Sequence, residues 1–123
     1  MERYREFTQD GKTFIEIDFS GLTKTDEFID LANTINQTIA KHPNHSVYTI
    51  TNIKNIRWFD QSIRGIVSEY MKKNTPYVKY GAVIGLDGVS RLLVSSIIKI
   101  TGRKNMTLAF SKEQAIEWLL KQK

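Results

Sequence analysis

The sequence predicts one α/β domain with a mostly parallel sheet whose first strand is antiparallel. Short β-branched and aromatic runs alternate with longer segments of helical periodicity, in the order β-β-α-β-α-β-α-β-α. This alternation is typical of parallel strands joined by right-handed helical crossovers. The first two strands are separated by Asp10-Gly11, a pair that favours a tight antiparallel hairpin. A length of 123 residues fits a single domain, so we assign residues 1–123 to it.

The opening segment is expected to form a hairpin followed by an amphipathic helix. The second strand alternates, and it places Ile15, Ile17 and Phe19 toward the main core. Oxygen-bearing side chains in 23–26 are expected to cap the helix that follows. The apolar stripe of this helix recurs at spacings of three and four: Phe28, Leu31, Ile35 and Ile39.

The middle of the chain predicts two more strands around a helix. Residues 47–50 are β-branched and aromatic, as in an interior strand, and 78–84 form the next strand. Asp60 is placed to cap the helix between them. The inward positions of that helix are Ile63, Ile66, Val67 and Tyr70.

The last third predicts a helix, a strand and a final helix. The first of these has an apolar face and a glycine at its C-cap: Val89, Leu92, Leu93, Ile97, Ile100 and Gly102. Met106, Leu108 and Phe110 alternate and are expected on one face of the last strand. Ser111 with Gln114 is a capping-box pattern. The final helix is expected to dock through Ile116, Leu119 and Leu120, with Trp118 at its edge.

Composition excludes several classes of function. The chain has no cysteine, which rules out disulfides, thiolate metal sites and a cysteine nucleophile. Its net charge of +5 permits an anionic partner without requiring one. The basic pairs 72–73 and 103–104 are scattered, and no basic stripe with stacking aromatics indicates nucleic-acid binding.

The sequence shows no membrane or secretion signal. The N-terminus is charged with no apolar run behind it, as expected for a chain without a signal peptide. The longest apolar region, 89–100, is interrupted by polar residues and falls short of the ~20 residues that a spanning helix needs. The expected location is the cytoplasm.

The element order, the opening hairpin with its helix, and the segment 51–65 resemble the STAS/SpoIIAA-like family, which includes anti-sigma-factor antagonists. Members of that family open a helix with Asp-Ser-Ser-Gly, and Asp60, Gln61, Ser62 and Ile63 stand at these positions here. Gln61 and Ile63 depart from the motif. The resemblance implies a SpoIIAA-like fold, shared with CRAL-TRIO domains, and places Ser62 where the family carries its phosphorylatable serine.

The candidate interaction surface lies at the carboxyl ends of the strands, where open α/β sheets usually bind their ligands. We define the rim as segments 52–62 and 86–89. The start of its helix favours anions, although Asp60 also has a simpler explanation as a cap. Trp58 and Phe59 form either an exposed anchor or a lid folded onto the core. The candidate residues are Arg57, Trp58, Phe59, Asp60, Ser62, Asp87 and Gly88.

Other patterns carry less chemistry. His42 and His45 lack the further ligands that a metal needs, so no metal site is expected. Ser62, His45 and Asp60 could form a triad on paper, but no nucleophile-elbow motif supports it. The segment 81–88 lacks both the G-x-G-x-x-G order and the Walker lysine. We therefore predict no catalytic residue and no cofactor.

The leading hypothesis is a non-enzymatic binding or regulatory domain that acts through protein–protein interaction, with Ser62 phosphorylation as a candidate switch. The alternative is a small-molecule or lipid carrier with a pocket between helices and sheet. An enzyme would need convergent titratable groups, which the sequence does not show. A homodimer through the edge of the first strand or an apolar helix face is left open.

Overall fold

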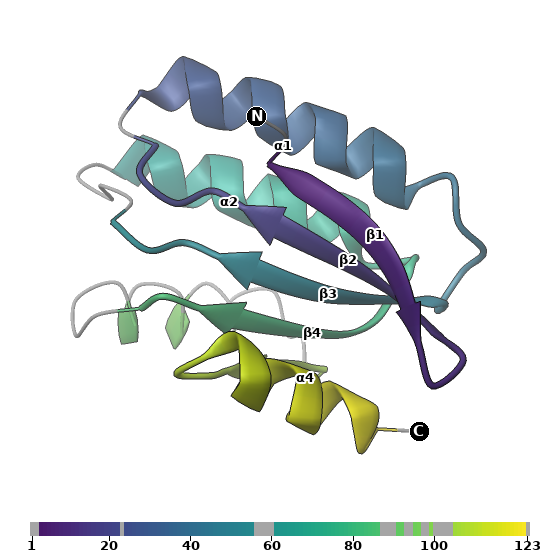
Figure 1. Cartoon of the computed structure of the whole chain (residues 1–123). Helices are drawn as coiled ribbons and strands as arrows, with labels where there is room; N and C mark the ends of the chain where they lie inside the picture. The colour runs from purple at the N-terminus through teal and green to yellow at the C-terminus, as the bar shows by residue number, and fades with distance from the viewer. Residues whose placement is uncertain are drawn as a thin grey trace.

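A five-stranded sheet separates two layers of helices (Figure 1). The computed structural model describes residues 3–22, 24–55, 61–86, 91–92, 95–96, 99 and 105–122, with only the backbone for 61–64. The elements in this part of the chain are β1 (Tyr4–Gln9), β2 (Lys12–Asp18), α1 (Thr25–Ile39), β3 (Val47–Asn52), α2 (Gln61–Asn74), β4 (Val78–Ile84), β5 (Met106–Leu108) and α4 (Lys112–Leu120).

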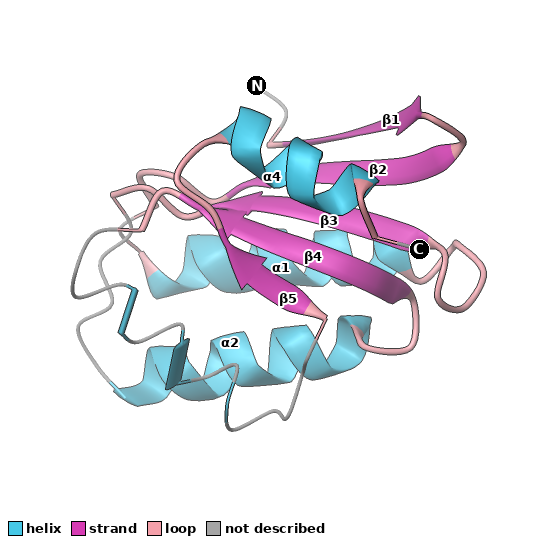
Figure 2. Ribbon diagram, turned by 90° about the horizontal axis from the view of Figure 1, so that it is seen from below, coloured by secondary structure: helices cyan, strands magenta, loops and turns pink. Residues whose placement is uncertain are grey.

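The strands of the sheet run in the predicted directions. Their order is β1-β2-β3-β4-β5, with β1 antiparallel to β2 and the remaining neighbours parallel. Helices α1 and α2 lie on one face and α4 on the other (Figure 2). The predicted fold class is therefore confirmed.

The opening hairpin forms as its turn residues predict. Gln9 pairs with Lys12 across the turn, and Asp10 and Gly11 have φ of 52° and 76°. Two positive φ values are what a type I′ turn requires, and Asp-Gly adopts them at low cost. This turn sets the register that carries Phe14 opposite Phe7.

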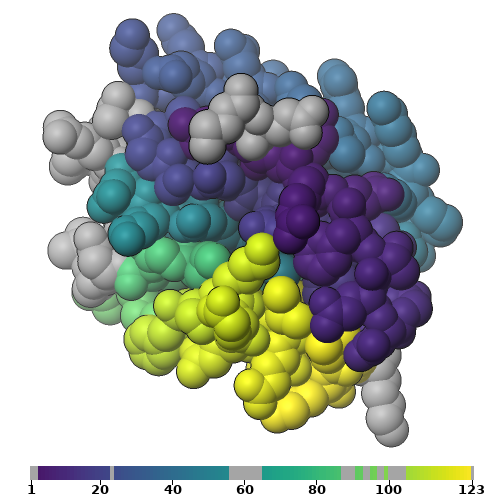
Figure 3. Space-filling model, in the orientation of Figure 1, coloured from purple at the N-terminus to yellow at the C-terminus, as the bar shows by residue number. Residues whose placement is uncertain are grey.

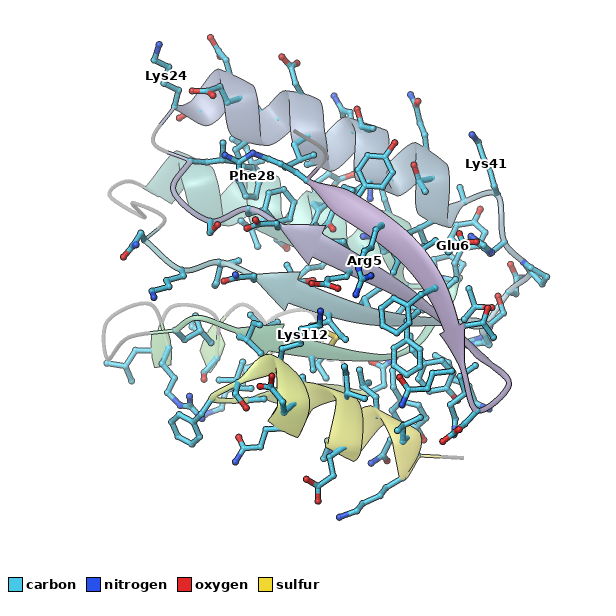
Figure 4. All side chains as sticks on the ribbon, in the orientation of Figure 1. Arg5, Glu6, Lys24, Phe28, Lys41 and Lys112 are labelled. Atoms are coloured by element: carbon cyan, nitrogen blue, oxygen red, sulfur yellow. The ribbon has the colours of Figure 1, made fainter. Side chains whose placement is uncertain are left out.

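The face toward α1 and α2 holds the main core. Ile15, Ile17 and Phe19 are 0–1% exposed, as their alternation predicts. Phe28 points from α1 toward the sheet (Figure 4), and its ring centroid lies 4.7 Å from that of Phe19. From α2, Tyr70 meets Phe19 edge to face at 5.5 Å. These contacts fix both helices against the segment that follows β2.

The opposite face carries a row of aromatic rings that crosses the sheet. We call the aromatic row Phe7, Phe14, Tyr48, Tyr80 and Trp118. Successive ring centroids lie 5.0, 5.7, 6.1 and 5.8 Å apart, from the edge strand to α4. Separations of this size favour offset and edge-to-face ring contacts. The row ties β1, β2, β3, β4 and α4 into one cluster.

Both ends of α4 are held by side chains. The Gln114 N–H donates to Ser111 Oγ at 3.1 Å, and the Phe110 N–H donates to Gln114 Oε1 at 3.0 Å. The predicted serine cap is therefore present, whereas the return bond of the capping box goes to the Phe110 N–H instead of the Ser111 N–H. At the other end, Lys12 Nζ donates to the carbonyls of Leu120 and Gln122 at 3.2 and 3.0 Å. A lysine here suits the negative end of the helix dipole.

Three expectations need correction. Lys24, not an oxygen-bearing side chain, occupies the N-cap of α1 and forms no side-chain cap, although Asp26 and Glu27 favour the first turn electrostatically. Leu92 is 76% exposed rather than buried. Phe110 is 78% exposed because β5 ends at Leu108, so the alternation does not extend to it.

Much of the helix expected at 89–100 lies outside the described residues. Its described residues, at 91–92, 95–96 and 99, are helical. Gly102, the expected C-cap, is not among them. No helix in the described ranges is both long enough and apolar enough to cross a membrane.

Candidate functional site

The carboxyl ends of the central strands meet at one edge of the sheet, on the left in Figure 1. Backbone hydrogen bonds join the segments that leave them. The Phe19 N–H donates to Asn52 O at 2.8 Å, and the Ile53 N–H donates to Ile84 O at 3.0 Å. The described flanks of the rim, 52–55 and Leu86, therefore start from neighbouring strands. This is the placement that the sequence predicted for them.

The loops after β3 and β4 approach each other closely at Gly85. A Cβ built on Gly85 would lie 2.6 Å from both Asn52 Oδ1 and the Lys54 nitrogen. Gly85 also has φ of 85°, which disfavours other residues. Asn52 Oδ1 accepts from the Lys54 N–H at 3.0 Å and so shapes the turn after β3. The backbone at this edge is thus held by local hydrogen bonds as well as by Ile53, which is buried in the core.

An open hollow of about 340 Å³ lies beside these loops. We define the hollow by its lining residues: Lys54, Asn55, Gly85, Leu86, Ala109 and Phe110. The Phe110 ring is 78% exposed, and the guanidinium carbon of Arg91 lies 4.7 Å from its centroid. A large exposed ring next to two cationic side chains, Arg91 and Lys54, can bind an apolar group that carries negative charge.

Most of the sequence-predicted site falls outside the described residues. Arg57, Trp58, Phe59, Asp60, Asp87 and Gly88 are not described. The backbone of Ser62 lies in the first turn of α2, as expected, and its side chain is not described. Whether these residues share one surface stays a prediction.

Sequence reasoning missed Phe110 as a surface residue. Strand alternation placed it on one face of the last strand with Met106 and Leu108, yet the same sequence carried the contrary signal. The capping box at Ser111 places Phe110 just before a helix start, where the strand has already ended. Phe110 could have been identified as exposed if the helix start at Ser111 had been given priority over the strand alternation.

A second feature is a cavity of about 60 Å³ between the sheet and the helices α1 and α2. It has mainly apolar walls and is lined by two buried polar residues, Thr49 at 5% and Asn74 at 4% exposure. Asn74 Oδ1 accepts from Asn36 Nδ2 at 2.6 Å. Within the described part of the chain, neither the Thr49 hydroxyl nor the Asn74 NH₂ group has a hydrogen-bond partner. Buried polar groups normally have one, so the cavity can satisfy a small polar ligand or water.

Because Gly81 has no side chain, it leaves space for two side chains that line the cavity. A Cβ on Gly81 would lie 2.6 Å from both Thr49 Oγ1 and Met106 Sδ. Glycine here therefore lets the two side chains occupy adjacent positions over β4. Neither the cavity nor this packing could be read from local sequence, because its walls come from distant segments.

An ion-pair cluster joins both ends of the sequence near the edge of the sheet. Glu16 Oε2 lies 3.0 Å from Arg5 Nε and 3.0 Å from Lys112 Nζ. Figure 4 shows Arg5 on β1 and Lys112 at the start of α4. Partial burial raises the pKa of Glu16, but hydrogen bonds and charges from Lys112 and Arg5 outweigh it and hold the pKa below 4.5. These ion pairs therefore help to hold β1, β2 and α4 together and do not indicate a catalytic site.

The histidines occupy separate positions. His42 Nε2 lies 2.7 Å from Glu6 Oε1. His45 has φ of 55° in the turn before β3, and its N–H donates to Pro76 O at 3.0 Å. Across the described ranges, no three histidine or carboxylate groups gather as a metal ion would require.

Two solved structures have a similar fold. An uncharacterized protein of the DUF3478 family from Shewanella loihica PV-4, described as having a SpoIIAA-like fold, aligns with TM-score 0.70 and 12% identity over 94% of this chain and 91% of that one. An anti-sigma-factor antagonist (STAS) domain protein from Planctomyces limnophilus aligns with TM-score 0.58 and 13% identity over 93% and 96%. No family model and no curated protein matches the sequence. The chain therefore has a SpoIIAA-like fold.

Proposed function

We propose that this SpoIIAA-like chain is a cytoplasmic, non-enzymatic regulatory domain that binds a protein partner through the rim and the hollow. The observation that carries the proposal is Phe110, a 78% exposed ring at the carboxyl edge of the sheet, with Arg91 beside it. Exposed aromatic and arginine side chains are the residues that most often anchor protein interfaces. The fold of an anti-sigma-factor antagonist protein lends support at the level of architecture.

Charge defines the partner more closely. Lys54 lines the hollow and Arg91 stacks on Phe110, so the partner is expected to present an apolar group next to a carboxylate. Complementary charge of this kind mainly raises the association rate and selects among partners. Phosphorylation of Ser62, in the first turn of α2, would add a charge of about −1.5 to −2 to the rim. This negative charge would repel the carboxylate of such a partner and weaken its binding.

The test is quantitative capture of partners from the host lysate, followed by affinity measurement. Phe110→Ala and Lys54→Glu are expected to weaken binding at least about tenfold, as for interface anchors. Lys121→Glu is the matched control, since it makes the same charge reversal on the exposed end of α4. Trp58→Ala and Ser62→Asp test the rest of the rim. Unchanged binding by all four variants of the rim and the hollow would show that the partner does not bind at this surface.

The second candidate function is a small-molecule carrier, and the cavity favours it. The Thr49 hydroxyl and the Asn74 NH₂ group, which have no partner among the described residues, would hold the polar end of a ligand. A volume of about 60 Å³ admits only a few heavy atoms, compared with roughly 300–1,000 Å³ for drug-sized pockets. A lipid would therefore require the cavity to enlarge.

Native mass spectrometry of protein purified from its host separates the two functions. A non-covalent adduct that is lost on denaturation, and is absent in Thr49→Val, would favour the carrier. Thr107→Val is the matched control, because it makes the same change on β5, which is separated from β3 by β4, at a residue that does not line the cavity. A covalent phosphate at Ser62 would favour the switch. A co-purifying protein without either adduct would favour the binding domain alone.

A further inference from the structure

In the described part of the chain, no strand pairs with the outer edge of β1. The Asp18 N–H donates to Arg3 O at 2.7 Å, so residues 3, 5, 7 and 9 direct their backbone groups toward β2. Tyr4, Glu6 and Thr8 then direct theirs outward. Among the described residues none bonds to these outward groups. β1 lies at the surface of the molecule (Figure 3), and α4 packs over β3 and β4 instead.

Proteins usually protect such an edge with charged side chains. Here both charges at its centre are already engaged within the chain. Arg5 pairs with Glu16 at 3.0 Å, and Glu6 lies 2.7 Å from His42. The edge is therefore less protected than its sequence indicates.

We infer that β1 pairs antiparallel with β1 of a second copy of this chain, centred on Phe7. The two-fold axis of such a dimer must pass between one residue and the same residue of the other copy. An axis between two successive residues would pair side chains from opposite faces, whereas paired residues share a face of the sheet. Centring on Tyr4 would place Arg3 opposite Arg5. Centring on Arg5 or Glu6 would place a charged residue against its own copy. Centring on Thr8 would place Glu6 opposite Asp10.

The Phe7 register avoids every one of these like-charge pairs. It sets Phe7 against Phe7, Glu6 against Thr8 and Arg5 against Gln9. The backbone of Phe7 faces β2, so the two Phe7 residues form a non-hydrogen-bonded pair, the kind with the closest side chains. Glu6 and Thr8 supply the backbone hydrogen bonds on both sides of the axis.

This register also continues the aromatic row. Phe7 is half-buried and stacks on Phe14 with 5.0 Å between centroids and 4° between ring planes. A second Phe7 across the axis would cover the remaining exposed part of the ring. The row would then run from Trp118 of one copy to Trp118 of the other. With so short an edge, the dimer is expected to be reversible.

The absence of cysteine makes a clean test possible. Phe7→Cys places two thiols at a directly opposed pair, within the ~4.4–6.8 Å Cα separation that a disulfide needs. Mild oxidation is expected to give a covalent dimer on a non-reducing gel. Arg5→Cys and Gln9→Cys alone should not cross-link, because each would lie about 13 Å from its own copy. A mixture of those two variants should cross-link, since the register opposes residues 5 and 9.

A second measurement covers the case in which Phe7→Cys perturbs the fold. Thr8→Pro removes an outward N–H while leaving the hydrogen bonds between β1 and β2 intact. Sedimentation of the unmodified chain should show a concentration-dependent dimer, and Thr8→Pro should remain monomeric with an unchanged circular dichroism spectrum. A monomer at all concentrations, a dimer unaffected by Thr8→Pro, or cross-linking that ignores the register would overturn the inference.

Discussion

At the residue scale, the buried Thr49 hydroxyl is the group whose environment most needs explaining. It is 5% exposed, lines the cavity and lacks a partner within the described residues. An unsatisfied buried hydroxyl costs about 1–3 kcal/mol. Thr49→Val keeps the shape and removes the cost, so we expect the ligand-free protein to gain about 1 kcal/mol in free energy of unfolding. Urea denaturation measures this, and a loss of stability would mean that bound water or ligand already satisfies the hydroxyl.

At the element scale, α4 depends on its cap. Ser111 Oγ accepts from the Gln114 N–H, and the helix covers the aromatic row. Ser111→Ala is expected to lower the free energy of unfolding by about 1 kcal/mol. Ser111→Asp, which can still accept this hydrogen bond, is the matched control and should stay within a few tenths of the original value. Equal losses in both variants would show that the hydroxyl matters for packing rather than capping.

The elements also show what the sequence could and could not predict. Asp10-Gly11 and Ser111 act through neighbours in the chain, so the hairpin and the cap were predictable. Alternation could not say where β5 ends, and Phe110 was misplaced for that reason. The bond from Asn36 to Asn74 spans 38 residues, and the cavity beside it depends on such distant pairs. Long-range contacts of this kind leave no local pattern.

At the scale of the whole molecule, Glu16 makes stability depend on pH. Its pKa in the folded state lies below 4.5, so its contribution is present above pH 4.5 and is lost as pH falls through the folded value. Glu16→Gln is expected to cost up to about 1 kcal/mol at pH 7, since the pairs are partly exposed. Denaturation at several pH values should show this difference vanish in acid. Glu117→Gln, which removes an exposed pair with Lys121, is expected to change the free energy of unfolding little at pH 7; an equal loss in both variants at pH 7 would contradict the assignment.

The hydrogen bonds from Lys12 to the end of α4 also constrain the order in which parts of the protein can fold during synthesis. They join residues 108 and 110 positions apart, so they form only when nearly the whole chain is available. During synthesis from the N-terminus, the residues of the hairpin and β3 leave the ribosome before residues 112–120 do. Until then Phe14 and Tyr48 present an uncovered apolar face to the surrounding solution. A nascent chain in this state is a substrate for chaperones and a risk for aggregation, and docking of the last helix ends that exposure.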